Sequence, residues 1–295
     1  MYNFTEDELE QATLEWFEEL GYEKLYGPVL SPGGEYPERE DYSDVILDER
    51  VRDALQRINK NIPYDAIDEA FRKIKIPQSP SLLINNRAFQ RMITDGIDVE
   101  MRREDGSFKT EKLWLFDYEN DRNNEYIVVK QFTVIENGAE KRPDVVVFVN
   151  GTPLVTFELK SSSNEEVSIS EAYNQLQTYK KTIPSLFTYN SFMVISDGVN
   201  ARAGTLTSEE ERFMMWRTIE GDEVASLSIP QLEVLVKGMF HKSRLLDILK
   251  HFILFQIDGE KTIKILAGYH QYHAVNKAIA STQSAVSAEG DRRIG

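Results

Sequence analysis

Two apolar runs on either side of Asn150-Gly151 constrain the fold more than any other feature of the 295 residues. The sequence VVVFV (145–149) precedes this pair and LVTFELK (154–160) follows it. Both runs are rich in β-branched and aromatic residues, which favour strands. An Asn-Gly pair between two such runs is the strongest short-range signal of a β-hairpin. The sequence therefore predicts an antiparallel hairpin here.

Helical and strand patterns surround this hairpin. Thr5 and Glu8 form a capping box, and Gly21 ends the apolar periodicity that follows it, so a helix is expected over residues 5–20. Further helices are predicted at 48–59, 64–74, 81–101, 171–183, 230–252 and 269–280, and strands at 113–118, 126–136, 192–196, 201–206, 213–219 and 261–267. This order predicts an α/β fold with a central mixed sheet flanked by helices, followed by a helical connector.

The absence of cysteine excludes disulfides, thiolate metal sites and cysteine nucleophiles, and it fits a reducing compartment. No run of about 18 apolar residues is present, so no membrane-spanning helix is expected. The N-terminus, MYNFTEDELE, has neither the basic nor the apolar region of a signal peptide. These features predict a cytoplasmic protein that does not enter a membrane.

The net charge of −15 opposes a role in binding nucleic acid, which favours a basic surface. The acidity is concentrated at one end, because residues 1–50 hold 15 acidic and 3 basic side chains. The other residues are close to neutral and have room for a local basic face. The chain alone is expected to hold DNA weakly, with a partner or another domain presenting it.

The hairpin carries two acids and a lysine, Asp144, Glu158 and Lys160. Glu158 and Lys160 are two apart on a strand, so they share a face. A two-residue turn would pair Asp144 with Phe157 and place it on the opposite face. We therefore expect a three-residue loop, Asn150 to Thr152, or a bulge that restores the parity.

Two converging carboxylates repel each other unless a cation lies between them, and oxygen ligands suit Mg²⁺ or Mn²⁺. Such a metal polarises a phosphodiester and lowers the pKa of a bound water. Lys160 would then orient that water or stabilise the transition state. The alternative is a surface hairpin with scattered charges, because an Asp…Glu-x-Lys pattern is common by chance.

The segment PD(x)13ELK resembles the PD-(D/E)xK nuclease superfamily, and two further motifs resemble the restriction subunit of type I restriction enzymes. Gln175 and Tyr179, in EAYNQLQTY, resemble that family's QxxxY motif, which implies contacts with DNA near the scissile phosphate. The sequence AGYHQYHAVNKAI resembles the adenine-reading motif of the family's motor, and on that match Gln271 would bind the adenine of ATP.

The resemblance extends to the first helix, where Glu10 matches a further metal-proximal carboxylate; a solvated acid beside Glu15, Glu18 and Glu19 is the alternative. Lys180 and Lys181 follow Tyr179 and are candidates for phosphate contacts, the alternative being a solvated helix end.

The family's motor needs a GxxxxGK[ST] phosphate loop, which this sequence lacks. We therefore expect a fragment with a nuclease domain (1–225), a helical connector (226–260) and the first edge of a helicase-like motor (261–295). ATP would be a cofactor only of the full-length parent.

The resemblance implies Mg²⁺-dependent endonucleolytic cleavage of double-stranded DNA in a type I restriction system. It also implies a methyltransferase (modification) subunit and a DNA-specificity subunit as partners, and ATP-dependent DNA translocation by the parent. Two alternatives stay open. One is a standalone structure-specific nuclease, and the other is a catalytically silent docking module, which the net acidity favours.

Overall fold

The computed structural model describes residues 5–102, 106–161, 165–259 and 261–287. Within them, a mixed six-stranded sheet has the strand order β1-β4-β7-β8-β9-β10. Its strands are β1 (Glu23–Tyr26), β4 (Tyr126–Lys130), β7 (Val145–Val149), β8 (Thr152–Leu159), β9 (Phe192–Ser196) and β10 (Ala201–Gly204). The predicted α/β fold with a central mixed sheet is confirmed.

The two kinds of strand pairing follow from the connections. β8 and β9 are parallel, and the chain between them crosses over through helix α6 (Glu165–Thr182) and the short helix α7 (Pro184–Thr188). β1 pairs with β4 in parallel, whereas the other neighbours in the sheet are antiparallel. β7 and β8 occupy the middle of the sheet, and every residue of both strands is buried.

The predicted hairpin is formed by β7 and β8. Asn150 and Gly151 have positive φ angles of 48° and 76°, as both central residues of a two-residue type I′ turn require, and Val149 pairs with Thr152. The register then shifts, because Phe148 pairs with Pro153 whereas Val147 pairs with Val155. The parity is thus restored by a bulge, the second of the two predicted solutions, and the three-residue loop does not occur.

Asn150 is fully buried rather than exposed at the tip of a loop. Its Nδ2 donates to the carbonyl of Leu115 at 2.7 Å, and its Oδ1 accepts from the backbone N–H of Glu125 at 2.7 Å. Gly151 packs against helix α3 (Asp48–Ile58), where an added Cβ would lie 2.7 Å from the carbonyl oxygen of Leu47. The turn is therefore a packed structural element that fixes the end of the hairpin.

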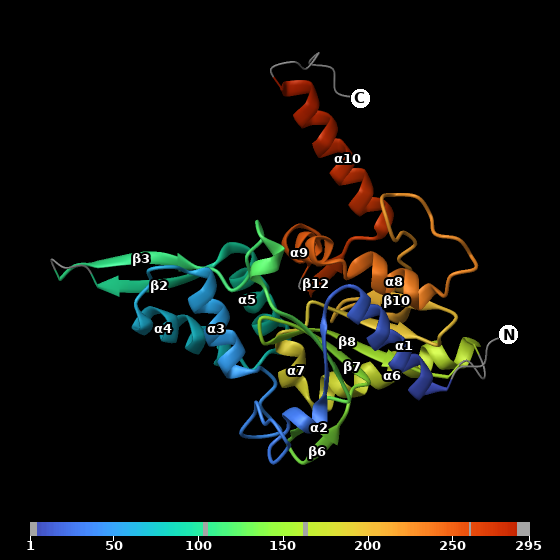
Figure 1. Cartoon of the computed structure of the whole chain (residues 1–295), viewed down its shortest axis with the longest axis horizontal. Coiled ribbons are helices and arrows are strands. Elements are labelled where there is room, and N and C mark those ends of the chain that lie inside the picture. The colour runs from blue at the N-terminus through green and yellow to red at the C-terminus, as the bar shows by residue number, and fades with distance from the viewer. Residues whose placement is uncertain (1–4, 103–105, 162–164, 260, 288–295) are drawn as a thin grey trace.

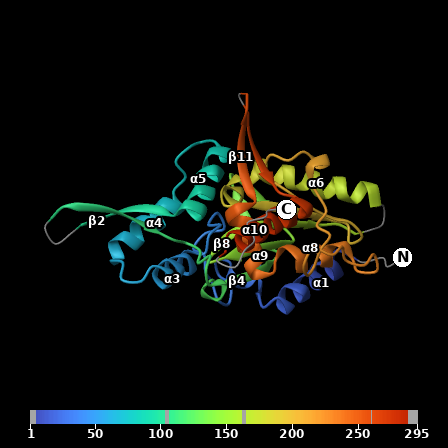
Figure 2. The ribbon, with the colours of Figure 1, turned by 90° about the horizontal axis from the view of Figure 1, so that it is seen from above.

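Helices cover both faces of the sheet (Figures 1 and 2). On one face, the rings of Phe17 in α1 (Glu6–Glu19) and of Phe240, just after α8 (Gln231–Met239), lie 5.8 and 5.4 Å from the ring of Phe157. Helix α6 packs against β8 and β9 on the other face. Because side chains alternate along a strand, Glu158 points away from Phe157 and toward the side of α6.

A second group of elements lies beside the sheet, at the left of Figure 1. It contains α3, α4 (Tyr64–Lys75), α5 (Leu82–Asp95) and the ribbon of β2 (Ile97–Arg102) and β3 (Phe108–Leu113). The small ribbon of β5 (Val134–Glu136) and β6 (Ala139–Lys141) leads into β7, and α2 (Gly27–Leu30) follows β1. Two short 3₁₀ helices lie in loops: η1 (Asp121–Asn123) between β3 and β4, and η2 (Glu210–Arg212) between β10 and α8.

The C-terminal part contains α8, α9 (Lys242–His251), the hairpin of β11 (Ile253–Asp258) and β12 (Lys261–Leu266), and α10 (Tyr269–Val286). Figure 1 shows α10 extending away from the sheet. The β11–β12 hairpin crosses the expected boundary between residues 260 and 261, and the domain limits stay a prediction. No helix in the described ranges is long and apolar enough to cross a membrane.

Most predicted elements are present, and the capping box of Thr5 and Glu8 is confirmed. The prediction was wrong at two strand boundaries. The helix expected over 81–101 ends at Asp95, and the next residues form β2, whose buried and exposed positions alternate. The strand expected over 113–118 is instead β3, which ends at Leu113.

Three other predicted elements are interrupted. The strand expected over 126–136 divides into β4 and β5 at Gln131, where φ is 58°. The helix expected over 230–252 divides into α8 and α9. Residues 213–219 form isolated bridges, such as Met214 with Ala203, instead of a strand.

Candidate active site

The hairpin brings Asp144 and Glu158 together. Continuing the register in which Val145 pairs with Phe157 places the two acids opposite each other, on one face of the sheet. The Oδ2 atom of Asp144 accepts a hydrogen bond of 2.7 Å from the backbone N–H of Leu159. Glu158 is fully buried. The strand geometry thus holds both carboxylates in fixed positions.

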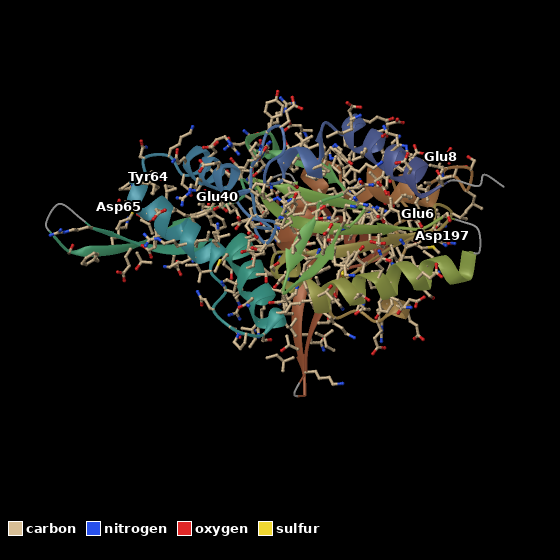
Figure 3. All side chains as sticks on the ribbon, turned by 90° about the horizontal axis from the view of Figure 1, so that it is seen from below. Glu6, Glu8, Glu40, Tyr64, Asp65 and Asp197 are labelled. Atoms are coloured by element: carbon tan, nitrogen blue, oxygen red, sulfur yellow. The ribbon has the colours of Figure 1, made fainter. Side chains whose placement is uncertain are left out.

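Lys160 completes this group from the end of β8. Its Nζ donates to Oε1 of Glu158 at 2.7 Å and lies 3.9 Å from Oε1 of Glu6 on α1. Its own backbone N–H donates to the carbonyl of Ser196, which extends the pairing of β8 with β9. Figure 3 shows Glu6 at this end of the molecule, together with Asp197, which follows β9.

The electrostatic environment raises the pKa of both acids. Burial is the main cause for Asp144, and the charges of Glu10 and Glu6 act in the same direction. Burial also raises the pKa of Glu158, with the Asp144 charge as the next cause. For Lys160, burial is the largest single cause and lowers the pKa, but the charge and hydrogen bond of Glu158 together with the charges of Asp144 and Glu6 outweigh it, so the net change is upward. The ammonium group therefore stays charged beside the two carboxyls.

Glu10 lies close enough for its charge to act on Asp144, but it has a partner of its own. Its Oε2 is 3.2 Å from Nζ of Lys130 and accepts a hydrogen bond of 3.4 Å from Nε2 of Gln131. Only 5% of Glu10 is exposed, and burial raises its pKa. The structure thus places Glu10 at the edge of the site, held by a lysine at the end of β4.

Gln175 and Tyr179 lie on the face of α6 that borders Glu158. Nε2 of Gln175 donates to the hydroxyl of Tyr179 at 2.6 Å. Burial raises the pKa of Tyr179, and the charge of Glu158 is the second cause. The two residues of the QxxxY pattern therefore form one unit beside the carboxylates.

The remaining predicted residues lie in different surroundings. Nζ of Lys180 donates to the carbonyl of Leu206 at 2.8 Å, and burial lowers the pKa of Lys180 to about 8. Lys181 is exposed. Oε1 of Gln271 accepts from the backbone N–H of Gly268 at the start of α10, so Gln271 caps that helix. The structure therefore does not bring Lys180 and Gln271 to the carboxylate pair.

The donor set fits a divalent cation at one point. Oε2 of Glu158 is buried and has no hydrogen-bond partner among the described residues, which leaves a buried carboxyl oxygen free to bind a cation. Asp144 adds a second carboxylate on the same face. No group of three or more acid or histidine side chains is placed to hold a metal in the described ranges. Any metal held by this pair would therefore complete its coordination with other oxygens, such as water or phosphate.

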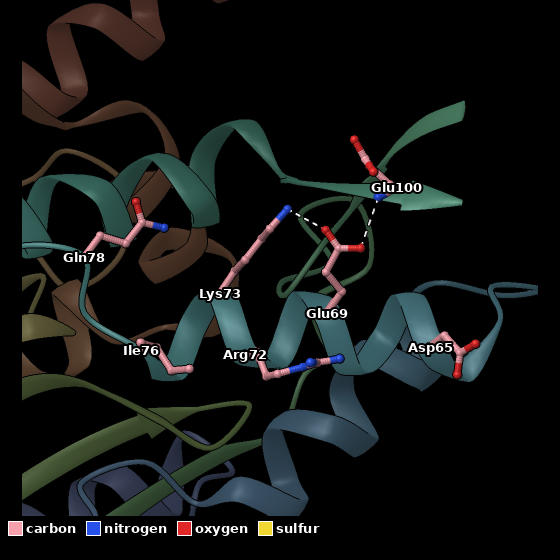
Figure 4. Close-up of a pocket in the computed structure, with 7 residues that line it drawn as sticks. All are labelled: Asp65, Glu69, Arg72, Lys73, Ile76, Gln78 and Glu100. Atoms are coloured by element: carbon pink, nitrogen blue, oxygen red, sulfur yellow. Dashed lines mark hydrogen bonds and ion pairs between the residues drawn. The ribbon is translucent and has the colours of Figure 1, made fainter. Parts of the chain in front are cut away.

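A separate cavity of about 520 Å³ lies between α4 and β2 (Figure 4). Two of its charged side chains pair with each other, because Oε1 of Glu69 is 2.6 Å from Nζ of Lys73, and Oε2 of Glu69 accepts from the backbone N–H of Glu100. Neither acid of the hairpin lines this cavity.

Sequence reasoning missed the contribution of Lys130. This residue ends the apolar run YIVVK, and its Nζ lies 2.6 Å from Oδ1 of Asp7 and 3.2 Å from Oε2 of Glu10. A lysine at the end of a buried strand was a visible signal, but its acidic partners lie on α1, more than one hundred residues away in the sequence. Glu6 was missed for the same reason.

The mixed sheet, with α1 and α6 on its two faces and a central hairpin that carries two acids and a lysine, defines a restriction-endonuclease-like fold. The sequence profile of the family described as the type I restriction enzyme R protein N terminus matches residues 3–212. The chain belongs to this family.

Relatives with similar sequences include the type I restriction enzyme HindI endonuclease subunit of Haemophilus influenzae. It is 38% identical over 98% of this chain and 28% of its own length. The putative type I restriction enzyme MjaIXP endonuclease subunit of Methanocaldococcus jannaschii is 33% identical over 97% of this chain and 29% of its own length. The chain thus spans less than a third of either relative.

Proposed function

We propose that this chain cleaves phosphodiester bonds of double-stranded DNA in a reaction that depends on Mg²⁺ or Mn²⁺. The observation that carries the proposal is the group formed by Asp144, Glu158 and Lys160. A buried carboxylate, Glu158, and a half-buried one, Asp144, both with raised pKa values, face each other across the hairpin, and a lysine touches Glu158. Burying two like charges is costly, and a divalent cation between them would remove that cost.

Each residue has a role in this proposal. Asp144 and Glu158 would hold the metal, which when bound polarises the phosphodiester and lowers the pKa of a water molecule. Lys160 orients the attacking water and stabilises the negative charge that develops on the phosphate. Its contact with Glu158 keeps the ammonium group in place and charged.

Gln175 and Tyr179 are proposed to position the DNA. The Tyr179 hydroxyl accepts a hydrogen bond from Gln175, and its own hydrogen, which interacts with Glu158 in the free chain, would be donated to a DNA oxygen in the complex. Glu10 is proposed as a further carboxylate near the metal, reached when its contact with Lys130 is exchanged for one with the metal or its water shell.

The longer proteins of this family imply a wider setting. We propose that the full-length parent acts as the endonuclease subunit of a type I restriction complex, with methyltransferase and DNA-specificity subunits as partners. In that parent, Gln271 would contact the adenine of ATP in a motor that moves DNA. The relatives' names and the match to the R protein N terminus support this setting.

A plasmid cleavage assay tests the proposed chemistry. Supercoiled plasmid is incubated with the purified chain and Mn²⁺, and the wild type is compared with Asp144→Ala and Lys160→Met. We expect nicked or linear product from the wild type and a loss of product with both variants. The melting temperature of each variant controls for folding.

Product formation at the same rate by wild type and variants would show that the cleavage does not come from this site. No product from the wild type at saturating Mn²⁺ would contradict nuclease activity of this chain. That result would favour the docking module, a role that fits the net charge of −15.

A further inference from the structure

A polar cavity of about 340 Å³ lies between the ribbon that ends in β6 and helix α6. We call it the β6–α6 pocket. Its lining residues are Glu140, Lys141, Arg142, Gln175, Thr178 and Tyr179. This pocket contains the whole QxxxY pair together with two cations that the sequence patterns did not single out.

Both walls of the β6–α6 pocket connect it to the candidate active site. On one wall, Arg142 stands two residues before Asp144, in the segment that leads from β6 into β7. On the other wall, Tyr179 is close enough to Glu158 for the negative charge of Glu158 to help raise the pKa of Tyr179. A ligand in the pocket would therefore lie next to the two carboxylates.

The two cations of the pocket are available to a ligand. Arg142 is exposed and Lys141 is partly exposed, and neither forms an ion pair with a described residue. In contrast, Lys160 is engaged by Glu158, and Lys130 by Asp7. Lys180, which the sequence suggested for phosphate contacts, donates to a main-chain carbonyl instead.

The composition of the pocket fits a phosphodiester. Arg142 offers a planar fork of donors that matches phosphate oxygens, and Lys141 adds a point charge. The Gln175 amide and the Tyr179 hydroxyl are neutral polar groups of the kind that contact the DNA backbone. Because the chain as a whole is acidic, DNA that approaches the carboxylates needs local cations of this kind.

We infer that the β6–α6 pocket binds a backbone phosphate of double-stranded DNA next to the bond to be cut, with Lys141 and Arg142 as its cationic contacts. This inference rests on the proposed nuclease function and names the part of the surface that receives the DNA. Glu140 lines the same pocket and opposes the phosphate by its charge.

Fluorescence anisotropy with a labelled DNA duplex tests this inference. The measurement is made without divalent metal and at low ionic strength, so that cleavage plays no part. Lys141→Gln and Arg142→Gln are each expected to weaken binding about five- to tenfold, the effect of losing a charged hydrogen bond. Each should also reduce the slope of log affinity against log salt by about 0.9.

Two further variants complete the test: one is expected to strengthen DNA binding, and the other is a control that should leave it unchanged. Glu140→Gln removes a repelling charge and is expected to strengthen binding. Arg102→Gln removes one exposed positive charge from the β2–β3 ribbon, which Figures 1 and 2 show at the opposite end of the molecule from α6. Binding by this control is expected to match the wild type, and melting temperatures verify the folding of all four variants.

The outcomes separate this inference from the proposed function. Weaker binding by the pocket variants, in a chain that shows no Mn²⁺-dependent cleavage, would keep the pocket and reject the nuclease. Cleavage by the wild type with unchanged binding by Lys141→Gln and Arg142→Gln would reject the pocket and keep the nuclease. A loss of affinity equal to that of Arg102→Gln, or no binding by the wild type at low ionic strength, would also overturn the pocket.

Discussion

The Asp144 carboxylate accepts a hydrogen bond of 2.7 Å from the backbone N–H of Leu159. Leu159 lies between Glu158 and Lys160, so this bond ties the acid of one strand to the centre of the Glu-x-Lys segment on the next. The donor is a main-chain group whose position the sheet fixes, so the bond orients the Asp144 carboxylate toward the next strand. Substitutions of Glu158 or Lys160 leave this bond in place and are expected to change the chemistry without moving Asp144.

Lys160→Met is expected to separate metal binding from catalysis. The variant keeps both carboxylates, so its affinity for Mn²⁺ should not fall, because removing a positive charge does not disfavour a cation. Cleavage should slow by on the order of a hundredfold or more, since a group that stabilises the transition state is lost. Calorimetry and plasmid cleavage measure the two effects, with Lys160→Arg as the variant that retains the charge. A parallel loss of metal affinity would contradict this role.

Glu10→Gln is expected to weaken Mn²⁺ binding less than Asp144→Asn does. The negative charge of Glu10 is already balanced by Lys130, whose Nζ is 3.2 Å away. Asp144 instead faces Glu158, whose Oε2 has no hydrogen-bond partner among the described residues. Isothermal titration of the two isosteric variants against the wild type provides the comparison. If Glu10→Gln abolished binding as completely as Asp144→Asn, Glu10 would be a direct and essential ligand.

Asn150→Ala is expected to lower the free energy of unfolding by about 3 kcal/mol. The change leaves the buried carbonyl of Leu115 and the N–H of Glu125 without their side-chain partner and places alanine at a positive φ. Urea denaturation measures the loss. Asn137→Ala is the matched control, because Asn137 is exposed and has a φ of 52°. Equal losses would show that backbone strain alone, and not the buried hydrogen bonds, explains the effect.

The burial of the Lys264 ammonium group predicts that the stability of the fold depends on pH. Its Nζ is buried, where it donates to Oδ1 of Asn86 at 2.9 Å and to the carbonyl of Asn190 at 2.8 Å, and burial lowers its pKa to about 7. Between pH 7 and the ordinary pKa of lysine, the unfolded chain therefore binds more protons than the folded one. Through this group, the free energy of unfolding rises with pH in that range.

Comparison with Lys264→Met isolates this contribution from all other titrations. The stability of the wild type relative to the variant is expected to increase by about 1.4 kcal/mol for each pH unit above 7. Urea denaturation at pH 7, 8 and 9 measures the difference between the two proteins. A difference that stays constant over this range would mean that Lys264 keeps an ordinary pKa in the folded state.

The sequence was sufficient to predict those features that depend on the conformational preferences of neighbouring residues. The turn at Asn150-Gly151 follows from two residues that tolerate positive φ, and the parity of Asp144 and Glu158 required a bulge or an odd loop. The position of the bulge, between the pairs of Val147 and Phe148, depends on packing and had no visible signal. The arrangement of the carboxylates was thus predictable, but not the distortion that produces it.

Elements with short or ambiguous patterns were harder to assign. The segment IDVEMR (97–102) is separated from α5 by Gly96, whose φ of 82° ends the helix, and pairing with β3 makes the segment a strand. Likewise, ILFQID (253–258) continues the apolar end of α9, but it pairs with β12. Contacts between distant segments, such as Lys130 with Glu10 or Lys264 with Asn86, leave no local signal.

Binding of Mn²⁺ to the folded chain, measured by calorimetry, tests the central claim most directly. The wild type is compared with Asp144→Ala and with Asp98→Ala, which removes an exposed acid from the distant β2–β3 ribbon. The account predicts saturable binding by the wild type and Asp98→Ala, and its loss in Asp144→Ala. Binding that survives in Asp144→Ala, or its absence in the folded wild type, would contradict a metal site on the hairpin.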